Sequence, residues 1–172
     1  MVATKADLYS RVRKLDISVT THAHRAVFTV DQSRAIRGDI DGGHCKNLFL
    51  KDKSKKLWLL VTLEDTAVDL KQLRHVIGSR HLSFSQENLL KKLISVNGVT
   101  APAFTLINDH ERRVNVVLDS NVFGHELLNF HPLDNTAITT IRSSDLLSFI
   151  YGCGHLFQII DMSICRKMEV RI

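Results

Sequence analysis

Apolar residues recur every three or four positions in several stretches of the chain, which is the spacing of one helical face. Leu8, Val12 and Leu15 follow this spacing behind Thr4, and Asp7 stands at the distance from Thr4 that suits a capping box. Gly78 is a stop signal behind a second such stretch. The pattern predicts helices over residues 4–16, 69–77, 85–94 and 144–151, and one or two helical turns within the polar residues 31–39.

Shorter stretches rich in apolar and β-branched residues predict the strands. Residues 47–50 and 57–63 flank a lysine-rich turn, and residues 104–107 and 114–118 flank a polar turn, so we expect two β-hairpins. Further strands are predicted over residues 17–21, 26–30, 137–141 and 156–160. Hairpins interspersed with helices indicate a mixed α/β (α+β) fold.

Composition sets limits on the class of protein. Of 172 residues, 44% are hydrophobic and 24% charged, so the chain can bury an ordinary globular core. It has two prolines, no Ser/Gly-rich linker and no internal repeat, and we expect one domain over residues 1–172. The first 15 residues are charged throughout, and no apolar run approaches the roughly 20 residues of a membrane span. These features predict a cytoplasmic protein with no membrane partner.

The net charge of +5 favours an anionic partner at one surface and permits nucleic acid without proving it. Three cysteines without a CxxC motif indicate reduced thiols. His22 and His24 form an HxH pair, but a second pair with metal-ligand spacing is lacking, so we expect no metal. GxSxG, Walker and GxGxxG motifs are also lacking, and Cys153 and His155 have no orienting acid near them in sequence.

Lys46 is more informative, because it enters an apolar strand directly after Gly42 and Gly43. At the mouth of a strand, a low dielectric would strengthen its attraction to a phosphate or a developing oxyanion. The alternative is an ordinary lysine that extends from a strand end to solvent. Residues 98–102 form a second candidate, a loop whose backbone N–H groups would bind an anion, with a plain turn as the alternative.

Four phrases of the sequence, taken in order, resemble one known family. They are AVFTVDQSRAIRGDIDGGHCKNLFLKDKSKKLWLLV, DLKQLRHVIGSRHLSF, TLINDHERRVNVVLD and LNFHPLDNTAITTI. They resemble the free-standing relatives of the editing (insertion) domain of bacterial prolyl-tRNA synthetase, the prolyl-tRNA deacylase or YbaK-like superfamily. The resemblance spans residues 8–161. It implies a single domain with a curved, mostly antiparallel sheet, and hydrolysis in trans of mischarged tRNA, with alanyl-tRNA(Pro) as substrate and no cofactor.

The resemblance also assigns roles to residues. The family's catalytic lysine corresponds to Lys46, followed by Asn47, and its pocket histidine to His131. Its Gly-x-x-x-Pro loop matches, with a one-residue shift, the segment Gly98, Val99, Thr100, Ala101 and Pro102. Strand position suggests Val27, Phe28, Val30 and Phe49 as walls of the amino-acid pocket, with core packing as the alternative. Lys51, Lys53, Lys55 and Lys56 are candidates for binding tRNA.

The expected partners are the acceptor end of tRNA(Pro) and, transiently, prolyl-tRNA synthetase. Two other functions stay open on this evidence. One is deacylation of cysteinyl-tRNA(Pro). The other is a non-catalytic module of the same fold that binds tRNA or a synthetase.

Overall fold

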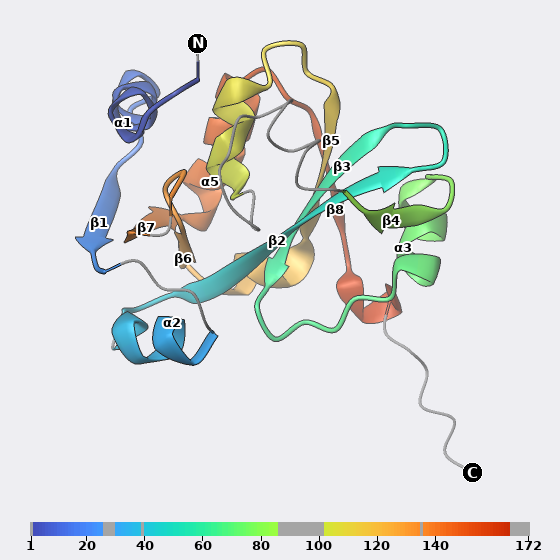
Figure 1. Ribbon diagram of the computed structural model, residues 1–172, viewed down its shortest axis with the longest axis horizontal. Coiled ribbons are helices and arrows are strands. Elements are labelled where there is room, and N and C mark those ends of the chain that lie inside the picture. Colours follow the sequence, from blue (N-terminus) through green and yellow to red (C-terminus); the bar gives the residue numbers. More distant parts are fainter. Residues whose placement is uncertain (1, 26–29, 39, 86–101, 135, 166–172) are drawn as a thin grey trace.

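Figure 1 shows a computed structural model of the chain, which describes residues 2–25, 30–38, 40–85, 102–134 and 136–165. The helices are α1 (Lys5–Lys14), α2 (Val30–Arg37), α3 (Leu70–Ile77) and α5 (Ser143–Gly152), with 3-10 helices η1 (Ala103–Asn108), η2 (Ser120–Gly124) and η3 (Met162–Cys165). The strands are β1 (Val19–Ala23), β2 (Gly43–Asp52), β3 (Leu57–Leu63), β4 (Leu82–Phe84), β5 (Val114–Asp119), β6 (Leu127–Phe130), β7 (Ala137–Arg142) and β8 (Phe157–Ile160).

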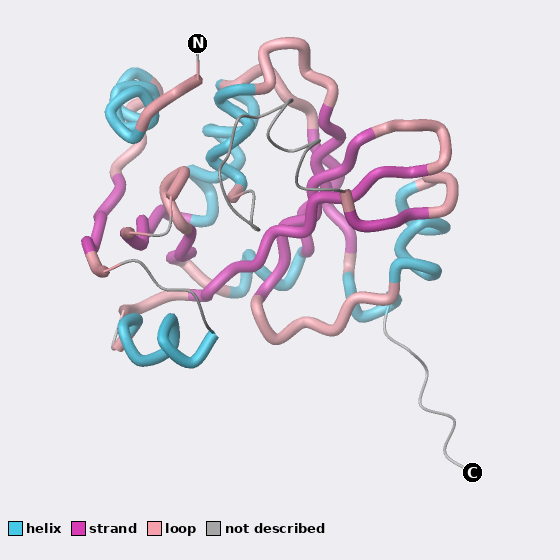
Figure 2. The backbone as a smooth tube through the Cα atoms, viewed as in Figure 1, coloured by secondary structure: helices cyan, strands magenta, loops and turns pink. Residues whose placement is uncertain are grey.

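The strands form one twisted mixed sheet in the order β1-β7-β6-β2-β3-β5-β8, and β4 pairs with β2 on the same edge as β6 (Figure 2). The pairs β1–β7, β6–β7, β2–β3 and β2–β4 are antiparallel. The pairs β2–β6, β3–β5 and β5–β8 are parallel. This architecture confirms the predicted mixed α/β fold with a mostly antiparallel sheet.

Hydrophobic side chains cover the two faces of the sheet unequally. The larger core includes Phe104 and Phe149, whose rings meet edge to face at 5.2 Å, and lies under α1, α5 and η1. The smaller core includes Trp58 and Leu73 and lies under α3. Because successive strand residues point to opposite faces, β2 contributes to both cores.

Capping residues close to each other in the sequence define the ends of α1 and α3. At α1, the Asp7 backbone N–H donates to Thr4 Oγ1, while the Asp7 carboxylate accepts from the Thr4 backbone at 2.8 Å. At α3, Asp69 caps the first turn, and Gly78 ends the helix with a left-handed φ of 70°. Both capping predictions are confirmed.

Several predicted elements are wrong in detail. Residues 104–107 form part of the 3-10 helix η1 after Pro102, and β5 pairs in parallel with β3 and β8, so the second hairpin does not exist. Val30 begins α2 and is not the end of a strand; residues 26–29 of that predicted strand lie outside the described residues. Residues 86–94 of one predicted helix also lie outside them, while β4 and β6 were not predicted.

In the described ranges, no helix combines the length and the apolar character that crossing a membrane requires.

Candidate active site

The candidate site lies where two parallel strands diverge. β2 and β6 pair only at Gly43↔Leu128 and His44↔Asn129. Along the same edge of β2, β4 begins pairing at Leu50. Within the described residues, β2 therefore has no strand partner on this edge between these two points.

The Gly-Gly pair before Lys46 allows the close approach of β2 to β6. Gly42 has a φ of +107°, and a Cβ built on it would lie 2.6 Å from the Leu127 backbone oxygen. A Cβ on Gly43 would lie 2.9 Å from the ring of His125. Any larger residue would strain the backbone or push β6 away. The close approach of the two strands thus explains why two glycines precede Lys46 on β2.

Lys46 lies on the open part of β2 with its side chain half-buried. Its Nζ donates to the Thr66 backbone oxygen at 2.5 Å, which fixes where the ammonium lies. Within the described residues it has no carboxylate partner. Since an ammonium has three donors, two stay available to an anionic or carbonyl ligand. A held but uncompensated charge of this kind is suited to electrostatic stabilisation.

His131 follows β6 directly, on the other side of the opening. Its Nδ1 donates to the Ala137 backbone oxygen at 3.0 Å, which leaves Nε2 with a free lone pair in the neutral ring. Burial lowers the pKa of His131 below its ordinary value of 6.5, although the Ala137 hydrogen bond opposes the shift. His131 is therefore a neutral hydrogen-bond acceptor near pH 7. The ring of His24, at the end of β1, meets it edge-on at 6.1 Å.

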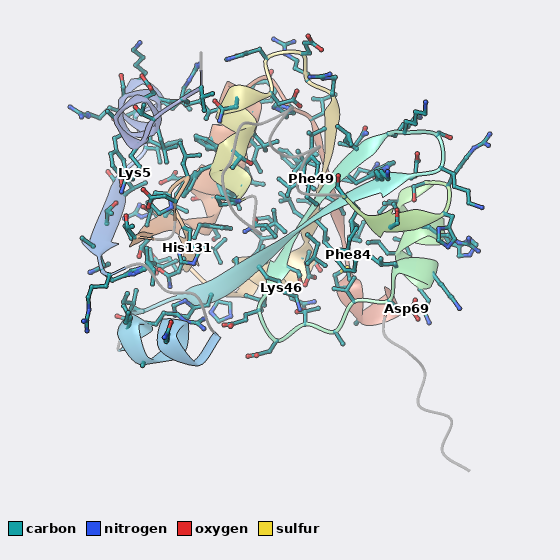
Figure 3. All side chains as sticks on the ribbon, in the orientation of Figure 1. Lys5, Lys46, Phe49, Asp69, Phe84 and His131 are labelled. Atoms are coloured by element: carbon teal, nitrogen blue, oxygen red, sulfur yellow. The ribbon has the colours of Figure 1, made fainter. Side chains whose placement is uncertain are left out.

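Strand alternation places Lys46 and His131 on one face. His44 is two residues before Lys46 on β2 and pairs with Asn129 on β6, which is two residues before His131. Side chains two apart in a strand share a face, and so do paired residues. Figure 3 shows Lys46 and His131 on the two neighbouring elements. This polar face is the one opposite the larger core.

A salt bridge ties α2 to the chain after β3 beside this face. Arg37, the last residue of α2, binds both carboxylate oxygens of Glu64, one of them at 2.9 Å. The Glu64 backbone N–H also donates to the His44 backbone oxygen at 2.9 Å. Burial, followed by the nearby charge of Arg37, lowers the pKa of His44. The edge of the site is thus rigidly held by a bidentate pair in which the Glu64 carboxylate neutralises the Arg37 guanidinium.

Other predicted residues lie elsewhere. Asn47 points to the opposite face from Lys46, and its Oδ1 is buried without a hydrogen-bond partner in the described part of the chain. Phe49 is 6% exposed and belongs to the larger core, so core packing accounts for it. Pro102 is buried, and its backbone oxygen accepts from Thr105 at 2.9 Å. Val27, Phe28, Gly98, Val99, Thr100 and Ala101 lie outside the described residues.

The predicted tRNA-binding lysines are not beside Lys46. Lys51 and the exposed Lys53, Lys55 and Lys56 belong to the end of β2 and the turn to β3. At about 3.3 Å per residue, Lys51 is roughly 17 Å along the strand from Lys46. These lysines therefore form a separate surface.

The thiols of Cys45 and Cys153 are poorly suited to act as nucleophiles. Burial raises the pKa of Cys45 to about 12 and that of Cys153 to about 11. His155 donates from Nε2 to the buried Asp109 at 2.9 Å and so is engaged in a structural pair. Among the described residues, no three of His, Cys, Asp and Glu converge where they would hold a metal ion.

Comparison with known proteins identifies the family. A model of the aminoacyl-tRNA editing domain family matches residues 24–149, most of the chain and all of the site's described residues. The chain belongs to this family. It is accordingly an aminoacyl-tRNA deacylase, an enzyme that hydrolyses a carboxylic ester.

Relatives and structures agree with this family assignment. The editing domain is 31% identical to the prolyl-tRNA editing protein ProX of Acetoanaerobium sticklandii, over 92% of this chain and 97% of that protein. It is 36% identical to prolyl-tRNA synthetase associated domain-containing protein 1 of Mus musculus, over 88% and 92%. A crystal structure of a candidate trans-editing enzyme for prolyl tRNA synthetase shares the fold, with a TM-score of 0.68, 14% identity and coverage of 94% and 98%.

Sequence reasoning missed the surroundings of Lys46 in the editing domain. Arg37 and Glu64 carry no motif, and their pairing depends on the fold of α2 over the sheet. The HxH pattern predicts that His22 and His24 share one face, as metal ligands or as solvated or hydrogen-bonded histidines, but it does not predict the contact with His131. The only signal for the contact between His24 and His131 would have been the β1–β7 pairing, which joins distant parts of the chain.

Proposed function

We propose that this editing domain acts in trans on mischarged tRNA(Pro) and hydrolyses alanyl-tRNA(Pro). The observation that carries the proposal is the half-buried ammonium of Lys46, held by the Thr66 oxygen at the open edge of β2 opposite a neutral His131. The relative from A. sticklandii is named a prolyl-tRNA editing protein, which supports tRNA(Pro) as the tRNA. The fit of alanine is argued from size below.

The chemistry needs little beyond charge and position. An aminoacyl ester is already activated, so attack by a held water molecule on its carbonyl suffices. In this proposal Lys46 stabilises the negative charge that develops on the carbonyl oxygen, or binds the phosphate of the terminal nucleotide. His131 accepts a hydrogen bond at Nε2 from the water or from the 2′-hydroxyl of the terminal ribose.

Further groups complete the proposed site. Asn47 is left out of the proposed site, because its side chain points to the face opposite Lys46. The backbone N–H groups of residues 98–101 are proposed as the oxyanion hole, which ends at Pro102 because proline has no backbone N–H. Prolyl-tRNA synthetase is proposed as a transient partner that releases the mischarged tRNA.

Alanine is favoured by the logic of a second sieve. A synthetase pocket built for proline cannot strongly reject the smaller alanine, because missing methylenes are worth only about 1–3 kcal/mol in an apolar site. An editing pocket that admits alanine must exclude proline by its size. Val27, Phe28 and Val30 are proposed as the walls that impose this limit.

Turnover of alanyl-tRNA(Pro) by substoichiometric protein is the test. We expect many cycles of deacylation per protein molecule, and Lys46→Ala to lose at least about 100-fold in kcat, as removal of one oxyanion-stabilising group does. Lys14→Ala, an exposed lysine on α1, is the matched control and is expected to retain wild-type activity.

The same turnover assay, extended to cysteinyl-tRNA(Pro) and combined with a tRNA-binding measurement, separates the alternative functions. If cysteinyl-tRNA(Pro) is hydrolysed faster than alanyl-tRNA(Pro), the substrate of the enzyme is the cysteinyl ester and not the alanyl ester. Binding of tRNA without turnover would show a non-catalytic module. An active Lys46→Ala variant would remove Lys46 from the mechanism.

A further inference from the structure

One end of the molecule carries a concentrated positive charge. It is formed by the β2–β3 turn, by α3 and by the connection from α3 to β4, which lie together in Figure 1. We call this surface the basic end, and it comprises Lys51, Lys53, Lys55, Lys56, Lys71, Arg74 and Arg80. Within the described part of the chain, none of these seven side chains forms an ion pair. Such unpaired cations create a potential that attracts a polyanion.

The acidic residues of this region are engaged with the backbone. Asp52 is buried, and its carboxylate accepts from the backbone N–H groups of Ser54 at 2.8 Å, Lys56 at 3.1 Å and Arg80 at 3.4 Å. Asp69 caps α3 in the same way. Asp52 thereby ties the lysine-rich turn to the α3–β4 connection. The fold thus brings cations from three segments into one surface.

An exposed aromatic ring lies between the basic end and Lys46. Phe84 on β4 is 62% exposed and pairs with Leu50 of β2. By strand alternation and the β2–β4 register, Phe84 shares a face with Leu50, Leu48 and Lys46. Leu50 is four residues from Lys46, or about 13 Å along the strand. Lys46, Phe84 and the basic end are therefore arranged along one direction of the sheet.

We propose that this arrangement is a docking track for the acceptor end of the tRNA, an inference that rests on the proposed deacylase function. The basic end binds backbone phosphates of the acceptor-stem duplex, and Phe84 stacks on a base of the unpaired 3′ strand, whose last nucleotide reaches Lys46. About four stacked nucleotides at roughly 3.4 Å each span about 14 Å, which matches the separation along β2. An exposed aromatic beside cations is the combination that binds single-stranded nucleic acid.

Charge reversal tests the basic end. We expect the double variant Arg74→Glu/Arg80→Glu to bind uncharged tRNA(Pro) transcript about 10-fold to 100-fold more weakly, with a salt slope shallower by about 2, as expected for two lost phosphate contacts. The matched control Arg13→Glu/Lys14→Glu places the same reversal on exposed positions of α1 and is expected to change the affinity less than twofold. Equal affinities of the two double variants for tRNA would overturn the proposal. The proposal would also be overturned if Arg74→Glu/Arg80→Glu lost binding to prolyl-tRNA synthetase and kept its affinity for tRNA.

A second pair of variants tests the stacking. Phe84→Ala is expected to raise KM for alanyl-tRNA(Pro) about 5-fold or more, while Phe84→Tyr keeps the wild-type value, because stacking on one base is worth about 1–3 kcal/mol. An alanine ester of adenosine has no preceding nucleotides to stack on Phe84. If Phe84→Ala raises KM for this ester by the same factor as for alanyl-tRNA(Pro), Phe84 does not stack on the 3′ strand and the proposed docking track is contradicted.

The two proposals fail separately. If the wild type binds tRNA with the expected salt slope and cleaves no aminoacyl ester, the deacylase proposal fails and the docking surface stands. If the wild type deacylates alanyl-tRNA(Pro) while the charge reversals do not alter affinity, the docking surface fails alone.

Discussion

Two side chains at the divergence of β2 and β6 are prepared in complementary ways. Lys46 is held by a backbone oxygen, so its charge is fixed in place without a neutralising carboxylate in the described part of the chain. His131 is fixed through Nδ1 and is kept neutral chiefly by burial. One group thus supplies charge and the other an acceptor, which suits stabilisation of an anion and orientation of a proton donor at the same substrate.

The pH dependence of kcat/KM tests the role of His131. Because burial lowers the pKa of His131 below 6.5, the neutral ring predominates at pH 7, and activity is expected to fall only as the pH drops through that lowered value. We expect His131→Gln, whose amide does not titrate, to lose this acidic limb. His22→Gln, an exposed histidine of β1, is the control and should retain it. An unchanged acidic limb in His131→Gln would assign the titration to another group.

At the scale of elements, the site depends on the short contact between the start of β2 and β6. Gly42 allows this contact, because a Cβ there would meet the Leu127 backbone oxygen at 2.6 Å. The contact sets the separation of the two strands and therefore the position of Lys46 relative to His131. Backbone packing two to four residues away thus controls the geometry of the site.

We therefore expect Gly42→Ala to lower both stability and activity. Gly78→Ala is a matched control, since Gly78 also has a positive φ but a Cβ there would meet nothing within 4 Å. The control is expected to cost about 1–2 kcal/mol of unfolding free energy, as for a left-handed non-glycine residue, and to keep its kcat. Gly42→Ala should cost more and reduce kcat on alanyl-tRNA(Pro). Denaturant unfolding and initial rates give both values, and equal effects of the two substitutions would disprove the contact's role.

The elements best predicted from sequence are those with local signals. Caps and apolar spacing sufficed for α1 and α3, and the lysine-rich turn sufficed for the β2–β3 hairpin. Residues 104–107 were misassigned because a short apolar run is buried alike in a strand and in η1, and periodicity cannot separate them. β6 was missed because four residues flanked by polar positions give little pattern.

The candidate site was predictable in part for the same reason. Lys46 was identified from its position after two glycines, and His131 only through the family resemblance. That these two residues lie on one face of the sheet depends on the parallel β2–β6 pairing, which joins segments more than 80 residues apart. Neither Arg37–Glu64 nor the contact of His24 with His131 has a local signature.

At the scale of the whole molecule, the positive charge is unevenly distributed. The net charge of +5 is modest, yet the basic end gathers seven cations that form no ion pair within the described residues. In the two proposals, catalysis takes place at Lys46 and RNA binding at the basic end, so each can be altered without the other.

Metal chelation should leave the activity unchanged. The histidine and cysteine spacings in the sequence lack a complete ligand set, and the proposed chemistry uses a lysine charge. Deacylation rates before and after dialysis against EDTA are the measurement. Loss of activity that zinc restores would contradict the prediction.

The central claim is that the editing domain removes alanine from tRNA(Pro) and spares proline. The most direct test compares initial deacylation rates of alanyl-tRNA(Pro) and prolyl-tRNA(Pro) at equal concentrations. Forcing the larger proline into a rigid pocket costs about 1–3 kcal/mol, so we expect the alanyl ester to react roughly 5-fold to 150-fold faster. Comparable rates on the two esters would contradict a pocket that selects by size, even if the protein proved to be an efficient deacylase.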